Sequence, residues 1–459
     1  MRPRNDAARH ALVAAMARRA GVGAAELASE VGISIPTLHR CLREIGPSVV
    51  VTGKARRTRY ALRRPLRGDI ADLPLYEVDA TGRAELLATL VLVQPHGACM
   101  RLADAGWPVP DESRDGWWDG LPYPLHDMRP QGYLGRQLAR AEHATLSVRA
   151  NPDSWSDDDV AHVLSRIGHD TSGNLILGNP AFERWQAARL SPPDAIQPRA
   201  LGRAYARLAD QAIGTGVLGS SAAGEFPKFP ALRELAGSDT PHVLVKFSGA
   251  DGSPAVRRWA DLLVCEHLAL QAAARLPGVQ SARSRIVEHS GRTFLEVERF
   301  DRHGLWGRSR LSSLATLDAA LLGDGSTDWV RMAHRLAELG LLARAEASRI
   351  EHLWWFGRLI GNSDMHAGNL SFRPQGTLQL APTYDMLPMR YAPLPGGEVP
   401  ARDFVPPLPL PPQRPVWLAA AEAALGFWQQ ASKDQRISEG FRGLCRANLQ
   451  AVQVAASRA

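Results

Sequence analysis

The chain has 459 residues, of which 45% are hydrophobic, and a formal net charge of +7. It contains no run of eighteen apolar residues, and its first residues lack the apolar segment of a secretory signal. We therefore expect a soluble cytoplasmic protein of two to four domains with no membrane partner. Four widely spaced cysteines match neither a metal-binding pattern nor a disulfide framework: Cys41, Cys99, Cys265 and Cys445.

The positive charge is concentrated near the N-terminus. Residues 1–67 carry a large excess of Lys and Arg over Asp and Glu, whereas the remainder is close to neutral. A small basic domain on a near-neutral body is typical of a protein that binds nucleic acid.

The spacing of apolar residues in this segment predicts three short helices, over residues 7–20, 24–31 and 34–45. Gly32 provides the turn between the second and third helices, and Ser34 is placed to cap the third. Helices in this order are typical of a helix-turn-helix.

Two short apolar stretches, 49–52 and 59–62, flank a basic tip and predict a hairpin, or wing. We therefore expect a winged helix-turn-helix DNA-binding domain over residues 1–67. The alternative is a helical hairpin plus strand that contacts protein. The residues expected to face DNA are Ser34, Thr37, His39, Arg40 and Arg43 on the third helix, and Lys54, Arg56, Arg57 and Arg59 on the wing.

The most informative motif is the segment 361–369, Gly-Asn-Ser-Asp-Met-His-Ala-Gly-Asn, followed by Asp385 sixteen residues after Asn369. A kinase-like phosphotransferase needs one carboxylate to accept the proton of the attacking hydroxyl, and an Asn and a second Asp to hold Mg²⁺. A predicted hairpin over 370–380 would return Asp385 close to Asn369. The motif predicts Asp364 as the catalytic base, and Asn369 and Asp385 as metal ligands. The alternative is an Asx-rich loop that only turns the chain.

A lysine within an apolar strand supports this interpretation. Only four of the 54 basic residues are lysines, and Lys246 lies in the strand 242–247, where a kinase places its phosphate-binding amine. A loop of small residues suited to polyphosphate, 214–229, precedes it. The following helix contains Glu266, which is either an ion-pair partner of Lys246 or a solvent-facing residue. The strand ending near residue 302 is placed as an adenine-binding hinge, so the motifs occur in kinase order.

These motifs resemble the HipA family of serine/threonine kinase toxins. The resemblance is carried by Ser221-Ala222-Ala223-Gly224, Lys246, Glu298-Arg299-Phe300-Asp301-Arg302, the segment 361–369 and Tyr384-Asp385. The added N-terminal winged helix is similar to the YjjJ-type branch.

The resemblance implies an α+β, two-lobed protein-kinase-like fold that uses ATP and Mg²⁺. The N-terminal lobe would span residues 68–302, and the C-terminal lobe 303–459, with a poorly structured Pro-rich insertion at 393–415. Autophosphorylation is implied at Ser221, with Ser220 as its neighbour. The implied ATP contacts are Ala223, Gly224, Glu225, Phe226, Pro227, Lys228, Lys246, Glu298, Arg299, Phe300, His366, Ala367, Gly368, Asn369 and Tyr384.

The resemblance also suggests a protein substrate, such as an aminoacyl-tRNA synthetase, and a homodimer. Family toxins usually pair with a separate helix-turn-helix antitoxin, whereas this chain carries its own DNA-binding module, so autoregulation is expected. Two other functions stay open. One is a transcriptional regulator whose kinase fold senses nucleotide, although a degenerate site would be expected to have lost one of its motif residues. The other is a metal-dependent nuclease using Asp364, His366 and Asp385.

Overall fold

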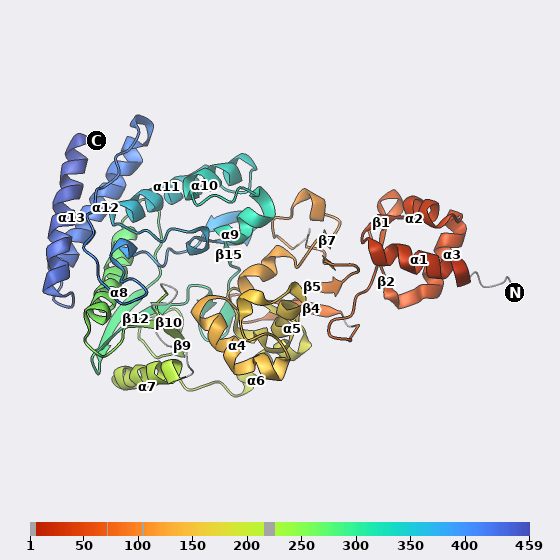
Figure 1. The fold of residues 1–459 in the computed structure, drawn as a ribbon, viewed down its shortest axis with the longest axis horizontal. Coiled ribbons are helices and arrows are strands. Elements are labelled where there is room, and N and C mark those ends of the chain that lie inside the picture. Colours follow the sequence, from red (N-terminus) through yellow and green to blue (C-terminus); the bar gives the residue numbers. More distant parts are fainter. Residues whose placement is uncertain (1–5, 71, 103–104, 215–224) are drawn as a thin grey trace.

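A computed structural model describes residues 6–70, 72–102, 105–214 and 225–459. The chain combines helices and sheets, as expected, and runs from an N-terminal module at one end of the molecule to a pair of long helices at the other (Figure 1). Within the described ranges, no helix is long and apolar enough to cross a membrane.

The N-terminal module, residues 6–62, has its own hydrophobic core, which includes Leu12, Met16, Leu27 and Leu38. Three helices pack on a three-stranded antiparallel sheet of order β1-β3-β2. The elements are α1 (Asp6–Arg18), β1 (Val22–Gly23), α2 (Ala24–Val31), α3 (Ile35–Ile45), β2 (Val49–Thr52) and β3 (Arg59–Leu62).

The predicted turn and cap in this module are confirmed. Gly32 ends α2 in the left-handed region, with φ 70°, a conformation that favours glycine. The Ser34 hydroxyl accepts a hydrogen bond from the backbone N–H of Thr37 at 3.4 Å and so caps α3. Local patterns therefore determine where these helices end.

A middle module, residues 73–190, contains a five-stranded sheet of order β7-β6-β5-β4-β8. Its three helices accompany this sheet (Figure 1). The elements are β4 (Leu73–Val78), β5 (Ala84–Leu92), β6 (Ala98–Cys99), β7 (Trp117–Trp118), α4 (Gly132–Leu146), α5 (Asp157–Ile167), β8 (Leu175–Leu177) and α6 (Asn179–Leu190).

A second, antiparallel sheet has the order β11-β12-β10-β9 and lies between α7 and α8. Alternate residues of β10 point to opposite faces. Val243 and Val245 pack with α7 in one cluster, whereas Lys246 points toward α8. The elements are α7 (Leu201–Gly214), β9 (Lys228–Leu232), β10 (His242–Phe247), α8 (Pro254–Ala273), β11 (Ser284–His289) and β12 (Arg292–Glu298).

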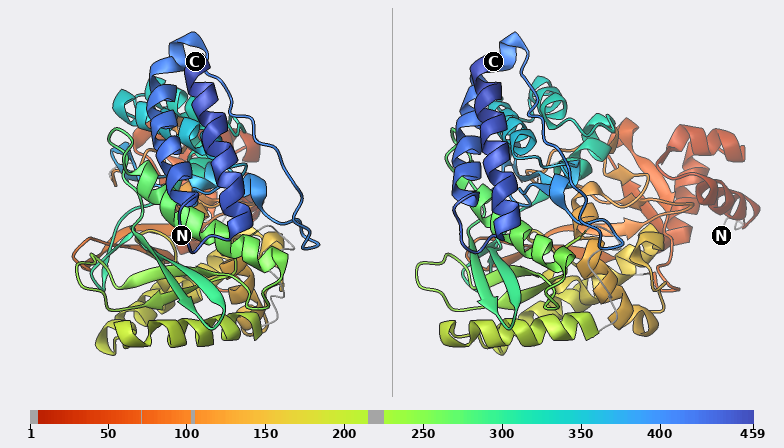
Figure 2. Two further views of the ribbon diagram at one scale, coloured as in Figure 1. Left: turned by 90° about the vertical axis from the view of Figure 1, so that its left-hand side faces the viewer. Right: turned by 60° about the vertical axis from the view of Figure 1, so that its left-hand side comes forward.

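The remainder is mostly helical and packs around buried Trp329, Trp417 and Trp428. Helices α12 and α13 lie side by side at the end of the molecule opposite the N-terminal module (Figure 2). The elements are β13 (Arg302–His303), β14 (Gly307–Arg308), β15 (Ser312–Ser313), α9 (Leu314–Leu317), α10 (Trp329–Glu338), α11 (Arg344–Leu359), β16 (Ser371–Gln375), β17 (Thr377–Leu380), α12 (Arg414–Ala431) and α13 (Glu439–Arg458).

The Pro-rich strap, residues 393–413, is held in place by specific contacts. It contains no helix or strand up to residue 410, because proline removes backbone donors and keeps the preceding residue extended. However, Trp417 Nε1 donates to the carbonyl of Pro407 at 2.9 Å, and Arg390 Nε donates to the carbonyl of Asp403 at 2.7 Å. This segment is thus extended and is anchored by specific contacts. The interpretation of residues 393–415 as an insertion stays a prediction.

Candidate active site

A cavity of about 940 Å³ lies where the middle module, the β9–β12 sheet and the 361–369 loop meet. Its lining residues come from segments as far apart in the sequence as Gly120 and Met389. The predicted site residues that line it are Glu225, Phe226, Lys228, Lys246, Asp364, His366, Gly368, Asn369, Tyr384 and Asp385.

The innermost group is a buried ion pair between β10 and α8. Lys246 Nζ lies 2.7 and 2.8 Å from the two carboxylate oxygens of Glu266, and it also donates to the carboxylate of Asp385. Lys246 is 4% exposed and Glu266 is fully buried. Of the two alternatives for Glu266, the ion-pair partner is therefore confirmed.

The electrostatics keep this lysine charged. Burial alone would lower the pKa of Lys246, but the carboxylates of Asp385 and Glu266 outweigh burial and raise the pKa above its usual value. Lys246 also lowers the pKa of Asp385, against the effect of burial. The site thus holds a fixed ammonium beside an ionised carboxylate.

The 361–369 loop presents Asp364 at the surface of the cavity. The Asn362 side chain accepts the N–H of Asp364 at 3.0 Å, and Asn369 Nδ2 donates to the carbonyl of Asp364 at 2.8 Å. These two amides fix the backbone while the Asp364 side chain stays 51% exposed, with His366 Nε2 4.0 Å from its carboxylate. An accessible carboxylate on a fixed backbone suits a proton acceptor.

The predicted hairpin is present and returns the chain to this loop. Strands β16 and β17 pair antiparallel around Gly376. The Tyr384 hydroxyl then donates to the carbonyl of Gly368 at 2.7 Å and shares a hydrogen bond of 2.7 Å with Ser371. Asp385 follows with φ 51°, a left-handed conformation that Asp tolerates better than most residues. Its carboxylate therefore faces the same cavity as Asn369.

The donor set fits Mg²⁺ bound together with a nucleotide. Asn369 and Asp385 both line the cavity, and each side chain carries an oxygen that could bind a cation. Across the part of the chain that the structure describes, no group of three or more His, Cys, Asp or Glu side chains could hold a metal ion. Mg²⁺ commonly takes one or two protein ligands and completes its shell with phosphate oxygens and water. The assignment of Asn369 and Asp385 as metal ligands stays a prediction.

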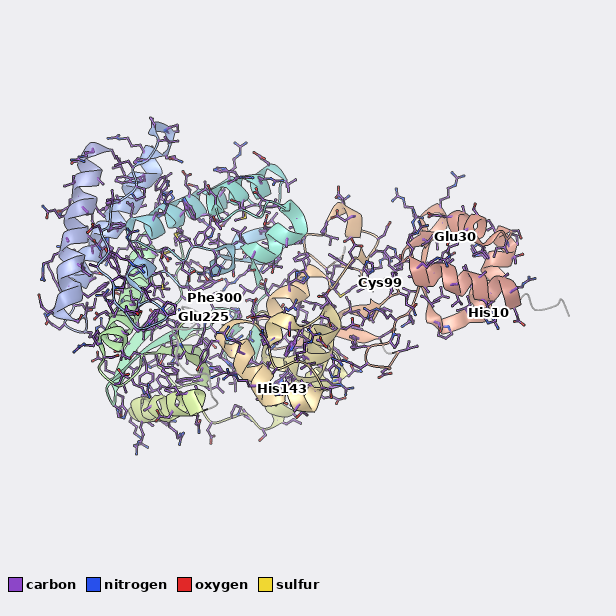
Figure 3. The ribbon with its side chains drawn as sticks, viewed as in Figure 1. His10, Glu30, Cys99, His143, Glu225 and Phe300 are labelled. Carbon is purple, nitrogen blue, oxygen red and sulfur yellow. The ribbon has the colours of Figure 1, made fainter. Side chains whose placement is uncertain are left out.

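Of the predicted hinge residues Glu298, Arg299 and Phe300, two have side chains that pair with residues outside the cavity lining. Glu298 accepts from Arg233 at 2.7 Å, and Arg299 pairs with Asp301 at 3.0 Å. Only Phe300 contacts a residue of the cavity lining through its side chain, with its ring centroid 5.6 Å from that of Tyr384. Figure 3 shows Phe300 and Glu225 in the middle of the molecule. A role for Glu298 and Arg299 in adenine binding stays a prediction that concerns their backbone.

The charged residues of this motif join the sheet to the middle module instead. Asp301 accepts the N–H of Gly173 at 2.9 Å, and Arg302 donates to the carbonyl of Gly173 at 2.7 Å. Burial alone would raise the pKa of Asp301, but the guanidiniums of Arg299 and Arg302 hold it well below its usual value. Sequence reasoning missed the contacts of this cluster with Asp170 and Gly173, because those partners lie more than 100 residues away in the sequence.

Sequence reasoning also missed the wall of the cavity that the middle module supplies. Asp127 accepts the N–H and the hydroxyl of Ser313, each at 2.7 Å, and the hydroxyl of Thr316 at 2.9 Å. Asp127 thereby holds the start of α9, although it lies 186 residues before Ser313 in the sequence. The only sequence signal is a polar dipeptide inside a Pro- and aromatic-rich stretch. Lining residues from this wall are Gly120, Leu121, Leu125, His126, Asp127, Arg129, Gln131, Gly132, Asp157, Val160 and Ser172.

The small-residue loop is only partly described. Ser220, Ser221, Ala223 and Gly224 lie outside the described residues, so their predicted roles stay predictions. From Glu225 onward the chain is anchored. Glu225 pairs with Arg136 at 2.8 Å and with Lys228 at 3.6 Å, and Pro227 accepts the N–H of Phe247 at 3.1 Å. Ala367 begins the short turn that ends at Asn369.

The predicted DNA-facing residues lie on the free side of the N-terminal module. Helix α3 is on the side away from the body of the molecule (Figure 1). Exposed residues of the predicted set are Ser34, His39, Arg43, Lys54, Arg56 and Arg57, while Thr37, Arg40 and Arg59 are half-buried.

Comparisons with known proteins identify the family. Residues 70–186 match the model of the YjjJ-like toxin middle domain, and residues 220–439 match that of the HipA-like C-terminal domain. The chain is 38% identical over 426 residues to Toxin YjjJ of Escherichia coli strain K12, covering 92% of this chain and 93% of that protein. The chain belongs to the YjjJ-like toxin family.

Two solved structures are also similar to this YjjJ-like chain. One is from a Shewanella oneidensis MR-1 complex of HipA, HipB and operator DNA; it is 14% identical, with a TM-score of 0.47, and covers 84% of this chain and 97% of that one. The other is the Helicobacter pylori proinflammatory kinase CtkA; it is 11% identical, with a TM-score of 0.34, and covers 51% of this chain and 91% of that one.

Proposed function

We propose that this YjjJ-like protein is an ATP- and Mg²⁺-dependent kinase that phosphorylates serine or threonine hydroxyls. In this proposal the fold is kinase-like: the β9–β12 sheet belongs to one lobe and the helical part carrying the 361–369 loop to the other. The observation that carries the proposal is the buried pair of Lys246 and Glu266, directed at Asp385 in the cavity that Asp364 and Asn369 also line.

Each residue then has one task. Lys246 and Lys228 hold the phosphates as point charges. Asp364 accepts the proton of the acceptor hydroxyl. The Asn369 amide positions Asp364 by donating a hydrogen bond to the backbone carbonyl of Asp364. Asn369 and Asp385 would hold Mg²⁺, which when bound neutralises charge on the phosphates. Because the Asp364 backbone is already fixed, little reorganisation is needed during transfer.

Autophosphorylation at Ser221 or Ser220 and a toxic effect on the host cell are further parts of the proposal, supported by the family. A translation protein such as an aminoacyl-tRNA synthetase is the substrate class that the resemblance to HipA suggests.

We also propose that the N-terminal module is a winged helix-turn-helix that binds DNA and supports autoregulation. Its separate core, the cap at Ser34 and the exposed cations of α3 and of the 53–58 hairpin tip support this proposal. Those cations include Arg43, Arg56 and Arg57, which would neutralise phosphates or read base edges.

The decisive experiment is intact-mass analysis of purified protein incubated with Mg²⁺-ATP, with Asp364→Asn beside wild type. Wild type should gain one phosphate, mapped to Ser221 or Ser220. Asp364→Asn should slow the gain by about 10²–10⁴-fold, the usual contribution of a positioned base. The matched control is Asp115→Asn, at an exposed position that does not line the cavity. No gain by wild type, in protein shown to start unphosphorylated, would contradict the proposal and favour a nucleotide-sensing regulator.

A further inference from the structure

The first turn of α5 connects the cavity to the N-terminal module. Three consecutive aspartates follow Ser156, and each holds a different neighbour. The first, Asp157, lines the cavity and accepts the N–H of Leu121, another lining residue, at 3.1 Å. The start of α5 is thus part of the cavity wall.

The other two aspartates reach the segment that leaves the N-terminal module. Asp158 pairs with Arg64, and Asp159 pairs with Arg67. Each pair has one mostly buried side chain: Arg64 is 19% exposed against 37% for Asp158, and Asp159 is 18% exposed against 40% for Arg67. These arginines follow β3 directly, the strand that forms one side of the proposed wing.

The N-terminal module is docked on the middle module instead of hanging from a free linker. Val50 and Ala61 of the N-terminal module share a hydrophobic cluster with Val93 and Cys99 of the middle module. The backbone continues this contact, since Arg64 donates its N–H to the carbonyl of Leu92 at 2.9 Å. A displacement of β3 would therefore be transmitted to Arg64 and its carboxylate partner.

The N-terminus of α5 is stabilised by hydrogen bonds of its own. The Ser156 hydroxyl accepts the N–H of Asp159 at 3.2 Å, and the Asp159 carboxylate accepts the N–H of Ser156 at 3.0 Å, which forms a capping box. One short, rigid turn therefore contacts the cavity wall with one residue and the exit of the N-terminal module with the next two.

We propose that DNA bound by the N-terminal module and nucleotide bound in the cavity change each other's affinity through the first turn of α5. This inference rests on the proposed function, because it needs both ligands to bind. Such coupling is reciprocal: if DNA changes the affinity for nucleotide by a given factor, nucleotide changes the affinity for DNA by the same factor. The carriers are the contacts of Arg64 and Arg67 with α5, which connect two sites that share no residue.

The test measures the Kd with which the full-length protein binds the Mg²⁺ complex of adenylyl imidodiphosphate. The Kd is measured at low salt, once without DNA and once with saturating random-sequence duplex DNA. In wild type, DNA should change this Kd by about fivefold or more, the lower end of typical coupling. In Arg64→Gln/Arg67→Gln the ratio of the two Kd values should fall to near one, while the Kd without DNA stays within about twofold of wild type.

The matched control removes two arginines that also pair with the acid at the start of a helix. In Arg442→Gln/Arg446→Gln, the lost partner is Glu439 of α13, which neither lines the cavity nor belongs to the N-terminal module. This variant has the same change in charge and should keep the wild-type ratio. If Arg64→Gln/Arg67→Gln folds poorly, Asp158→Asn removes the Arg64 contact alone and should reduce the ratio by itself, since Asp158 takes no part in the capping box.

The outcomes separate the inference from the proposed function. A ratio of one in wild type, with both ligands bound, overturns the coupling and leaves the kinase proposal intact. A wild-type ratio that persists in Arg64→Gln/Arg67→Gln and in Asp158→Asn overturns the route through α5. Failure of the nucleotide to bind without DNA, or of DNA to bind at all, contradicts the proposed function and removes the inference with it.

Discussion

Lys228 and Lys246 lie directly opposite each other on the antiparallel strands β9 and β10, and both line the cavity. Two of the four lysines of the chain are thus cross-strand neighbours. Like charges in this arrangement repel each other, and the carboxylates of Glu225, Glu266 and Asp385 offset part of that repulsion. The arrangement makes sense if a polyanion such as a triphosphate lies between them.

Replacing Lys228 should therefore weaken nucleotide binding without lowering the stability of the fold. In Lys228→Met, the loss of repulsion should leave the free energy of unfolding without nucleotide unchanged or raise it by up to about 1 kcal/mol. The affinity for Mg²⁺-ATP should fall about tenfold, or about 1.4 kcal/mol. Calorimetric titration and thermal melting measure the two effects. Lys433→Met, at an exposed position near α13, should change neither. An unchanged nucleotide affinity in Lys228→Met would contradict a phosphate-binding role.

Gly357 offers a test of how precisely the 361–369 loop must be held. A Cβ at this position of α11 would lie 2.5 Å from Sδ of Met365, the residue after Asp364. Alanine favours a helix over glycine by about 1 kcal/mol, and a methionine end can move, so the stability of Gly357→Ala should stay near that of wild type. Turnover should fall by about tenfold or more, because the loop shifts.

The control for this variant is Gly357→Ala/Met365→Ala, which removes the obstructing sulfur and should regain part of the lost rate. Phosphate transfer by intact mass and the melting temperature are measured on the same samples. Equal losses of rate in the single and double variants would show that the position of Met365 is not the cause.

The cluster around Asp301 predicts how stability depends on pH. Its pKa is held below the usual value of about 3.9 by Arg299 and Arg302, against the effect of burial. A carboxylate with a lowered pKa in the folded state stabilises the fold above its unfolded pKa, and this stabilisation is lost as the pH falls through the folded pKa. Wild type should therefore lose stability steadily below about pH 4.

Asp301→Asn should cost about 3 kcal/mol at pH 7, because two buried guanidiniums lose a charged partner. Its melting temperature should also vary less between about pH 5 and pH 2 than that of wild type. Scanning calorimetry across this range is the measurement. Asp115→Asn, at an exposed position, should follow the wild-type curve. If the melting temperatures of Asp301→Asn and wild type change with pH in parallel, Asp301 is not the group responsible for this pH dependence.

The hairpin tip of the N-terminal module should contribute to DNA binding through charge alone. In Arg56→Ala/Arg57→Ala, DNA affinity should fall, and the slope of log K against log salt should become shallower by roughly two, one for each lost phosphate contact. Fluorescence anisotropy over a salt series measures this, and nucleotide affinity without DNA should stay unchanged. Arg18→Ala/Arg19→Ala, in the same module but paired with Glu30 and Glu26, is the control. An unchanged slope would rule out the wing assignment.

The sequence predicted those features that depend on neighbours in the chain. The left-handed Gly32, the hairpin of β16 and β17, and Lys246 inside an apolar strand each follow from a short pattern, and each is present. Glu266 was ambiguous, because a helical pattern does not show which element a given face will contact.

The rest could not be predicted, because it depends on contacts between distant segments. The pairing of Asp301 with Gly173 spans 128 residues, and that of Asp127 with Ser313 spans 186. Neither partner has a distinctive neighbourhood in the sequence, and the cavity wall that they position became visible only in three dimensions.

The anchored strap has a practical consequence for the integrity of the chain. Val405 is 83% exposed in an extended segment, the form in which proteases bind their substrates. Helix α12 nevertheless packs on α8 and α11, and its Trp417 and Trp428 are fully buried. A single cut in the strap would therefore yield two fragments that elute together and separate only under denaturing conditions. We expect packing alone to hold the C-terminal helices to the molecule after such a cut.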